Sequence, residues 1–587
     1  MKSMLFKGIL FLSVNFSSSN FQAFSQKPNI IIILSDDQGW GDLGFNGNSS
    51  VATPNIDRLA KDGIILNRFF VSPVCSPTRA ELLTGRHHVR CGVSSTSTGK
   101  ERLDLDETTI ADILKKAGYQ TAAYGKWHNG AQAPYHPNSR GFDDFYGFCS
   151  GHWGNYFDPV LEHNGEIVNG NGFITDDLTD HGLAFIEKNK KSPFFLYLPY
   201  NTPHSPMQVP EQWWKKYANK NINQHGTEAD KEEIDHTRAA LALSENIDWN
   251  VGRIMQKLED MKLSNNTIVL YFSDNGPNGN RWNGGMKGIK GSTDEGGIRS
   301  PMIITWKGKL PMNQKIEKIC SAIDLLPTLC DLANIKYVSP KPLDGKSLKP
   351  LLQNSNAKWS DRILYHYWEN KLSLRNQNYR LSDTDQLFDM EKDPNQLQDI
   401  AESNVEEYTK LKKVKTQWIK NVLIELPQKD LRPFIIGHPS LKTTQLPAGE
   451  AIGTGNIKRS NKYPNDSYLT NWVNTEDQIY WDVEVQEAGY FEIEIYYTCP
   501  KQDIGSTFSL TFGNAVIEGK IIETNDPPLK GMEHDKSPRI ESYVKDFKPL
   551  LLGKIYLEKG PGRLFLKAKE ISRAQVMDFK MLTLKRI

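Results

Sequence analysis

Between Pro28 and about residue 335, short apolar runs alternate with longer stretches that have helical periodicity. The short runs are not interrupted by polar residues, so both of their faces should be buried, as in a parallel sheet with helices on each side. Ligands of such sheets bind at the carboxyl ends of the strands. The pattern predicts an α/β domain with strands at 29–34, 120–124, 193–198 and 267–272 and helices at 55–61, 108–117, 177–188 and 232–257.

The second part of the chain changes character twice. Residues 379–381 and 386–389 have the pattern of short strands and 404–422 that of a helix, which indicates a smaller mixed unit. A stretch rich in Pro, Gly and Thr then predicts a linker. Beyond it, apolar and polar residues alternate, which is typical of an antiparallel β-sandwich. The predicted divisions are a signal peptide at 1–25, the α/β domain at 26–335, a smaller subdomain at 336–432, the linker at 433–461 and the sandwich at 462–587.

The first residues have the pattern of an export signal. Two lysines accompany a short apolar stretch, 9–14, and Ala23 and Ser25 provide the small residues of a cleavage site. The apolar stretch is too short to span a bilayer, which takes about 20 residues. No cysteine precedes Cys75, which argues against a lipoprotein anchor. We therefore expect a secreted or periplasmic protein without a stable membrane anchor.

Composition and charge narrow the choice of partners. The 587 residues exceed what one compact core usually holds, in agreement with several domains. Lys and Arg number 71 against 70 for Asp and Glu, so neither nucleic acid nor a membrane surface is expected as a partner. The six cysteines are scattered, which excludes a disulfide scaffold and a structural zinc site of the CxxC type. Cys320 and Cys330 could still pair in an oxidising compartment.

Two of the predicted strands end in the same way. The first leads into Asp36 and Asp37, and the last leads into Asp274 and Asn275. Three carboxylates and an amide at the carboxyl ends of strands suit a hard cation such as Ca²⁺ or Mg²⁺. Either pair alone is compatible with residues that merely cap a turn. Their occurrence at two strand ends of one domain favours a metal site.

Cys75 directly precedes a short predicted helix. Ser76 fits its N-cap, Pro77 its first helical position and Gly85 its end. Cys75 would then lie at a helix N-terminus, where free backbone N–H groups and the helix dipole favour an anion, with Arg79 over the same face. These residues alone are compatible with a nucleophilic thiolate of low pKa or with a buried cysteine before an ordinary helix.

Five segments, taken in order, carry a family resemblance. They are Cys-x-Pro-x-Arg at 75–79 with Leu-Thr-Gly-Arg at 83–86, Gly-Lys-Trp-His at 125–128, Pro-His at 203–204, Lys-Gly-Ile-Lys-Gly at 287–291 ahead of Glu-Gly-Gly-Ile-Arg at 295–299, and Gln-Leu-Phe-Asp-Met-Glu-Lys-Asp-Pro at 386–394. Over roughly residues 28–430 the chain resembles the type I sulfatases, relatives of alkaline phosphatase. The resemblance implies an alkaline phosphatase-like fold, with a doubly wound mixed sheet flanked by helices and a small α+β subdomain.

The resemblance also implies a cofactor and a metal. In this family the cysteine is converted to formylglycine (3-oxoalanine) by a maturation enzyme before or during export. By matching position, Asp36, Asp37, Asp274 and Asn275 would bind one ion, generally calcium, together with the hydrated aldehyde at Cys75. One hydroxyl of the hydrate would attack sulfur, and the second would then expel sulfate.

The remaining catalytic roles follow from the same resemblance. Arg79 would hold the modified residue, and Lys126 and Lys290 would clamp sulfate oxygens. His128 would act as a base toward the second hydroxyl, and His204 as the acid for the departing alcohol, a role that Lys290 could share. Cations fixed in a dry pocket stabilise the charge that develops on the sulfate oxygens. The resemblance thus predicts a sulfuric ester hydrolase.

Several further residues could contact a substrate. His87 and His88 are either substrate contacts or helix-end packing, because no third zinc ligand with fitting spacing is evident in the sequence. Aromatic and polar residues in predicted loops suit a sugar ring or simple loop packing: His152, Trp153, Asn155, Tyr156, Arg281 and Trp282. The tail loosely resembles carbohydrate-binding sandwiches, with Trp472, Tyr490 and Tyr496 as candidates for exposed aromatic residues, although a core or a lid explains them equally well.

Two other functions remain open at this stage. A phosphate or phosphonate monoester hydrolase of the same superfamily would share the fold, although phosphatases place Ser or Thr at the nucleophile position. A secreted glycan-binding protein with a degenerate site is the other, but every residue of the expected constellation is present. The expected substrate is a sulfated polysaccharide or oligosaccharide, such as ulvan, carrageenan, fucoidan or a glycosaminoglycan, and this choice rests on family analogy.

Overall fold

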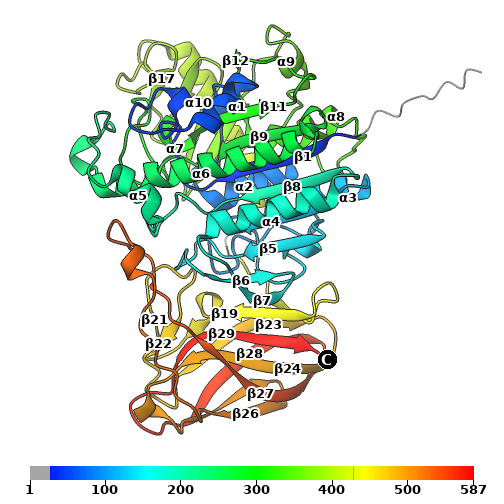
Figure 1. Ribbon diagram of the computed structural model, residues 1–587, viewed down its shortest axis with the longest axis vertical. Coiled ribbons are helices and arrows are strands. Elements are labelled where there is room, and N and C mark those ends of the chain that lie inside the picture. Colours follow the sequence, from blue (N-terminus) through cyan, green and yellow to red (C-terminus); the bar gives the residue numbers. More distant parts are fainter. Residues whose placement is uncertain (1–26, 428) are drawn as a thin grey trace, which may run out of the picture.

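A computed structural model describes residues 27–427 and 429–587. Figure 1 shows an α/β part that carries helices on both sides of a large sheet, and a β-sandwich beneath it that ends at the C-terminus. The predicted signal peptide, 1–25, lies outside the described residues. Among the described residues, no helix combines the length and the apolar character needed to cross a membrane.

A mixed ten-stranded sheet forms the centre of the α/β part. The five strands in its middle are parallel, as predicted, whereas β11, β2, β6 and β7 run antiparallel to their inner neighbours and β12 runs parallel to β2. In spatial order the strands are β12 (Gln314–Ile316), β2 (Ile64–Leu66), β11 (Met302–Thr305), β9 (Thr267–Ser273), β1 (Asn29–Ser35), β8 (Phe194–Pro199), β4 (Gln120–Lys126), β5 (Asp144–Phe148), β6 (Val160–His163) and β7 (Glu166–Asn169).

Helices cover both faces of this sheet, as the uninterrupted apolar strands require. Ile30, Ile32 and Leu34 of β1 pack with α2 (Cys75–Thr84), α3 (Ile110–Lys116), α8 (Leu325–Leu332) and α9 (Lys349–Gln353). Ile31 and Ile33 face the opposite core, which is covered by α1 (Pro54–Lys61), α4 (Ile174–Asn189), α5 (Glu211–Tyr217) and α6 (Ile234–Asp260). The predicted strands and helices of this domain are all present; β5 and the short outer strands were not predicted.

The smaller subdomain is an antiparallel four-stranded sheet with one long helix, which agrees with the predicted mixed unit. The strands are β14 (Leu364–Trp368), β15 (Lys371–Arg375), β16 (Tyr379–Leu381) and β17 (Leu387–Asp389), and the helix is α10 (Val405–Asn421). A separate short sheet contains β10 (Arg299–Ser300), β3 (Phe69–Phe70) and β13 (Cys320–Ser321). The helix α7 (Glu295–Ile298) directly precedes β10 in the chain. Cys320 and Cys330 are both buried free thiols, so they do not pair.

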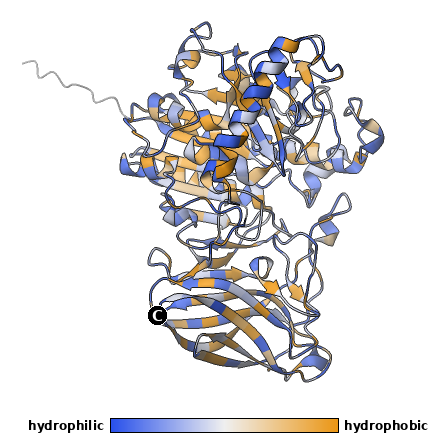
Figure 2. Ribbon diagram, turned by 180° about the vertical axis from the view of Figure 1, so that it is seen from behind, coloured by the Kyte–Doolittle hydropathy of each residue, from blue (hydrophilic) through white to orange (hydrophobic). Residues whose placement is uncertain are grey.

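The C-terminal sandwich consists of two six-stranded sheets. One contains β18 (Phe434–Ile436), β23 (Gln478–Val485), β28 (Gly560–Glu570), β25 (Thr507–Phe512), β26 (Ala515–Lys520) and β20 (Ile452–Gly453). The other contains β21 (Lys458–Arg459), β22 (Leu469–Thr470), β29 (Asp578–Arg586), β24 (Gly489–Thr498), β27 (Lys548–Leu557) and β19 (Thr443–Pro447). Figure 2 shows hydrophobic and hydrophilic residues alternating along these strands, as expected when one face of each sheet packs inward.

One prediction for this region is wrong, and for Trp472 the structure decides between two alternatives in favour of a core position. Residues 433–461 are not a linker, because β18 pairs with β23 and β19 pairs with β29, so the segment belongs to the sandwich. Its prolines lie in or beside short edge strands, where the hydrogen bond that a proline cannot donate is tolerated. Trp472 is not an exposed binding residue; it is 1% exposed, and its Nε1 donates to the Asp477 carbonyl at 3.2 Å. Tyr490, by contrast, is 59% exposed.

Candidate active site

The two acidic strand ends meet at one edge of the central sheet. β1 and β9 are parallel neighbours in which Ser35 is opposite Ser273, so the residues that follow lie side by side. The backbone N–H of Asp37 donates to Asp274 Oδ1 at 3.2 Å, and Asn275 Nδ2 donates to Asp37 Oδ1 at 2.8 Å. The side chains of all four predicted ligands are buried. Parallel pairing therefore brings together two segments that are more than 230 residues apart.

The start of α2 brings Cys75 to the same place. Ligand atoms of Cys75, Asp36 and Asp274 all lie within 4.8 Å of one another. Ser76 is not the N-cap, because the helix begins at Cys75 and its N-cap is Val74, in an extended conformation. The predicted end is confirmed, since Gly85 adopts a left-handed conformation (φ 69°) and its N–H donates to the Glu81 carbonyl. Burial raises the pKa of the Cys75 thiol, which argues against a nucleophilic thiolate of low pKa.

Three cationic side chains surround these carboxylates. Arg79 donates through Nε and Nη2 to Asp274 Oδ2, at 3.1 and 2.7 Å, and through Nη1 to the Lys126 carbonyl at 2.6 Å. Its guanidinium thus holds a carboxylate directly, whereas the sequence predicted that it would hold residue 75. Lys126 Nζ lies 2.7 Å from Asp36 Oδ2, and Lys290 Nζ lies 2.8 Å from Asp37 Oδ1. Lys290 is the more accessible lysine, with 20% of its side chain exposed.

His128 presents one free ring nitrogen in the site. Its Nε2 lies 2.8 Å from the Thr96 carbonyl, and its Nδ1 has no hydrogen-bond partner among the described residues. A carbonyl only accepts, so the neutral ring carries its proton on Nε2 and leaves the Nδ1 lone pair available. Burial, reinforced by Lys126, lowers the pKa of His128 well below its usual value. The ring is therefore a neutral proton acceptor near pH 7.

His204 lies next to Asp37. Its Nδ1 is 2.5 Å from the Ser205 carbonyl, and its Nε2 is 3.6 Å from Asp37 Oδ2. Burial lowers the pKa of His204 to about 4, although the Asp37 carboxylate opposes this shift. The free ring is thus neutral at pH 7. A bound anion would raise its pKa, because negative charge nearby favours the protonated ring.

The oxygen atoms at the strand ends fit a hard cation. Asp36 Oδ1 and Asn275 Oδ1 are buried and have no hydrogen-bond partner within the described part of the chain. Burial and the nearby Asp36 carboxylate raise the pKa of Asp274 to about 7, which shows that the carboxylates destabilise one another. A divalent ion bound by carboxylate and amide oxygens would satisfy the free oxygens and offset this repulsion. The donor set therefore fits calcium or magnesium.

The expected sugar-binding loop is more buried than its sequence indicated. The His152 ring stacks with His204 at a centroid distance of 6.1 Å, and Tyr156 donates through its hydroxyl to the His204 carbonyl at 2.8 Å. Arg281 binds Asp42 and donates to the Asp37 carbonyl, so it supports the strand end and does not face a substrate. Most of these residues position the site, and Trp153, which stacks on Phe148, stays partly exposed.

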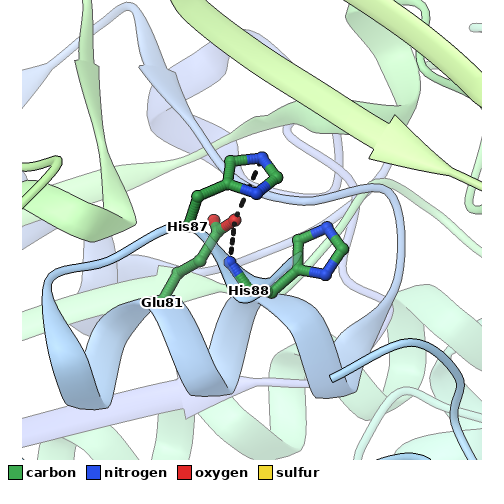
Figure 3. A group of neighbouring side chains, drawn as sticks. All are labelled: Glu81, His87 and His88. Carbon is green, nitrogen blue, oxygen red and sulfur yellow. Dashed lines mark hydrogen bonds and ion pairs between the residues drawn. The ribbon is translucent and has the colours of Figure 1, made fainter. Parts of the chain in front are cut away.

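A second cluster of ionisable residues lies at the other end of α2. Figure 3 shows the Glu81 carboxylate directed toward the His87 ring and the backbone nitrogen of His88. Glu81 is a third residue of a type that can bind a metal, beside His87 and His88. The sequence did not reveal it, because only the folded helix places Glu81 beside the turn that carries the residue six positions later. The two ring nitrogens of His88, however, lie 2.9 and 3.2 Å from the carbonyls of Val93 and Tyr367. His88 therefore has no ring nitrogen open toward an ion. His87 accepts from the Val89 N–H through Nδ1 at 3.4 Å, so its Nε2, which has no hydrogen-bond partner among the described residues, carries the proton of the neutral ring and offers no lone pair to an ion. Helix-end packing explains the pair.

Sequence reasoning also missed residues from the sandwich. Asn465 donates through Nδ2 to the Thr96 carbonyl at 3.1 Å, the same carbonyl that His128 contacts. Arg539 donates to the Gly154 carbonyl at 2.7 Å. No local signal could have identified these residues, because their partners lie more than 360 positions away along the chain.

Comparison with known proteins places this arrangement in a family context. A family model described as Sulfatase matches residues 28–335, and one described as N-sulphoglucosamine sulphohydrolase, C-terminal, matches residues 290–423. The N-acetylgalactosamine-6-sulfatase of Mus musculus is 33% identical over 383 residues, which cover 59% of this chain and 70% of that protein. The uncharacterized sulfatase YdeN of Escherichia coli (strain K12) is 32% identical over 416 residues, covering 59% and 72%.

Solved structures give the same result. The crystal structure of Ps i-CgsB in complex with k-i-k-neocarrahexaose superposes with a TM-score of 0.61 at 31% identity, over 69% of this chain and 94% of that chain. The phosphonate monoester hydrolase of Agrobacterium radiobacter has a TM-score of 0.53 at 20% identity, over 68% and 96% of the two chains, which shows a shared fold alone.

Proposed function

This chain belongs to the sulfatase family and is a sulfuric ester hydrolase with an alkaline phosphatase-like fold, and from that premise we propose its chemistry and substrate. The proposed substrate is a sulfated polysaccharide or oligosaccharide. Carrageenan is the first choice to test because a structural neighbour was solved with k-i-k-neocarrahexaose, and ulvan and fucoidan follow. We also propose that the protein is secreted or periplasmic. It would act after export and after a maturation enzyme has converted Cys75.

One observation carries the proposed chemistry. The first residue of a helix, Cys75, lies within 4.8 Å of ligand atoms of Asp36 and Asp274, inside a ring of three cationic side chains. A helix N-terminus favours negative charge, as do the cations, so the place suits an anionic ester. A formylglycine hydrate at position 75 would supply the attacking hydroxyl and a second hydroxyl that expels sulfate.

The charge balance explains why a metal and an anion belong together here. Three carboxylates (Asp36, Asp37 and Asp274) face Arg79, Lys126 and Lys290, and the two lysines are engaged by carboxylates. A calcium ion held by the carboxylates and by Asn275 would add two positive charges and polarise the group at position 75. The lysine ammonium groups would then be free to bind sulfate oxygens.

The histidines divide the proton transfers. The Nδ1 lone pair of His128 would accept the proton of the hydroxyl that expels sulfate. His204 would become an acid once the sulfate ester raises its pKa, and it would then protonate the departing alkoxide, with Lys290 as the alternative donor. The net reaction consumes one water and yields an alcohol, sulfate and a proton.

Mass spectrometry and sulfate release test this proposal. In protein from its native host, we expect the peptide with residue 75 to have lost sulfur and gained an aldehyde oxygen. The matched variant Cys75→Ala should fold but release no sulfate, whereas Cys91→Ala, at another buried cysteine, should keep activity. An unmodified thiol in active protein would contradict the formylglycine. Faster cleavage of phosphonate than of sulfate esters would favour the alternative hydrolase.

A further inference from the structure

The loop that carries Thr96 contacts both the catalytic domain and the sandwich. The Thr96 carbonyl lies 2.8 Å from His128 Nε2 and 3.1 Å from Asn465 Nδ2. Asn465 in turn accepts through Oδ1 from the Ser150 hydroxyl at 3.3 Å. His128 has a left-handed backbone conformation (φ 64°), which is uncommon for a residue with a side chain and requires support from its surroundings.

The approach of the sandwich at this point is close. A Cβ atom on Gly151 would lie 2.2 Å from Asn465 Nδ2 and 2.6 Å from His128 Nε2, so a larger residue here would have to displace these side chains. The side chain of Asn465 and the ring of His128 thus both pack against Gly151. Any displacement of Asn465 changes the space in which the His128 ring is held.

The turn that carries Asn465 is itself anchored to both domains. Its neighbour Asp466 accepts from the Gly154 N–H at 2.6 Å and from Lys580 on β29, whose Nζ also donates to the Asp466 carbonyl at 2.7 Å. The Asp466 side chain is 3% exposed. A buried, charge-assisted anchor of this kind fixes a turn more firmly than neutral hydrogen bonds do.

We propose that Asn465 of the C-terminal sandwich is a positioning residue for His128, so that the sandwich is part of the catalytic unit and not a detachable binding module. This inference rests on the proposed role of His128 as a base. Asn465 fixes the Thr96 carbonyl, the carbonyl fixes the proton of His128 on Nε2, and the Nδ1 lone pair is thereby aimed into the site. Asn465 touches none of the carboxylates or lysines expected to bind the ion and the sulfate, so its loss should affect turnover more than substrate binding.

The test uses the full chain and two variants of one residue. Asn465→Ala removes the side chain, and Asn465→Asp keeps its shape but removes the donor to Thr96. We expect both to lower kcat for sulfate release about tenfold or more, since small misplacements of a catalytic group can cost up to about 100-fold, with KM changed less than about twofold. Asn461→Ala, in the same segment of the sandwich and donating only to the Ile540 carbonyl, should behave as wild type.

Crystal structures of the wild type and of both variants provide the second arm. We expect the His128 ring to rotate or to move away from Thr96 in both variants. Unchanged kcat together with an unmoved ring would overturn the inference, as would full activity of Asn465→Asp with loss only in Asn465→Ala, because the donor would then be irrelevant. If the wild type releases no sulfate from any ester, the proposed function fails, and the position of the ring alone decides the inference.

Discussion

The two ends of α2 carry two buried clusters of residues that are able to bind metals, and the clusters differ in what their polar atoms contact. At the N-terminal end, Asp36 Oδ1 and Asn275 Oδ1 have no hydrogen-bond partner among the described residues. At the C-terminal end, both ring nitrogens of His88 lie close to backbone carbonyls, and Glu81 accepts from the His88 N–H at 3.3 Å. Residue type and spacing alone do not distinguish the clusters. Free oxygen lone pairs, with cations nearby, favour the first as the proposed functional site.

Removing one carboxylate from the first cluster should have the largest effect. Asp36→Asn keeps the shape of the side chain but removes the charge that pairs with Lys126 and that we propose binds the ion. We expect kcat/KM for sulfate release to fall at least about 100-fold, in line with the loss of one electrostatic contact to the transition state. The measurement is sulfate release at several substrate concentrations.

The matched control is Asp324→Asn, which removes another buried carboxylate, one paired with Arg362 at 2.7 Å outside the site. It should lower stability, because it leaves a buried arginine without its partner, but should keep kcat/KM within a few fold. Equal loss of activity in the two variants would mean that Asp36 acts only through folding.

Calcium removal should have an intermediate effect on stability. An ion that binds only the folded protein stabilises it by about 2.7 kcal/mol when its free concentration is 100 times Kd. We expect EGTA to lower the thermal midpoint of the wild type and excess calcium to restore it. The variant Asp36→Asn should respond weakly and Glu81→Gln should respond like the wild type. The reverse pattern would place the ion at the second cluster.

The second cluster should produce the smallest effect, and one that depends on pH. Burial raises the pKa of Glu81 to about 8, so the folded protein retains a proton that the unfolded chain loses above its usual pKa of 4.5. The stability from this proton is complete below pH 4.5 and is lost as pH rises toward 8. Glu81→Gln cannot titrate, so its stability relative to the wild type should increase steadily between pH 5 and pH 8.

Denaturation midpoints of the wild type and Glu81→Gln at several pH values check this expectation, with activity measured alongside. Turnover should be unchanged, because Glu81 does not contact the first cluster. A difference between the two proteins that does not vary with pH would show that Glu81 is ionised in the folded state.

The local pattern was sufficient for much of the fold and for predicting that the proposed ligands lie together. The uninterrupted apolar strands 29–34 and 267–272 predicted a sheet buried on both faces, and their acidic ends predicted Asp36, Asp37, Asp274 and Asn275 as neighbours. The local pattern was misleading where one composition is compatible with two different structures. The Pro and Gly residues of 433–461 lie in or beside short edge strands and do not form a linker. The alternation around Trp472 did not reveal that its indole is buried.

The sequence by itself determined the α/β domain, the strand ends that carry oxygen ligands and the helix that begins near Cys75, because each depends on hydrophobic periodicity or on residues adjacent in the chain. Only the tertiary structure decided that Lys126 and Lys290 contact carboxylates, that His128 carries its proton on Nε2, and that Asn465 reaches Thr96 from the sandwich. Those properties arise from hydrogen bonds and charges between segments up to 369 residues apart, and no local pattern encodes which distant groups meet.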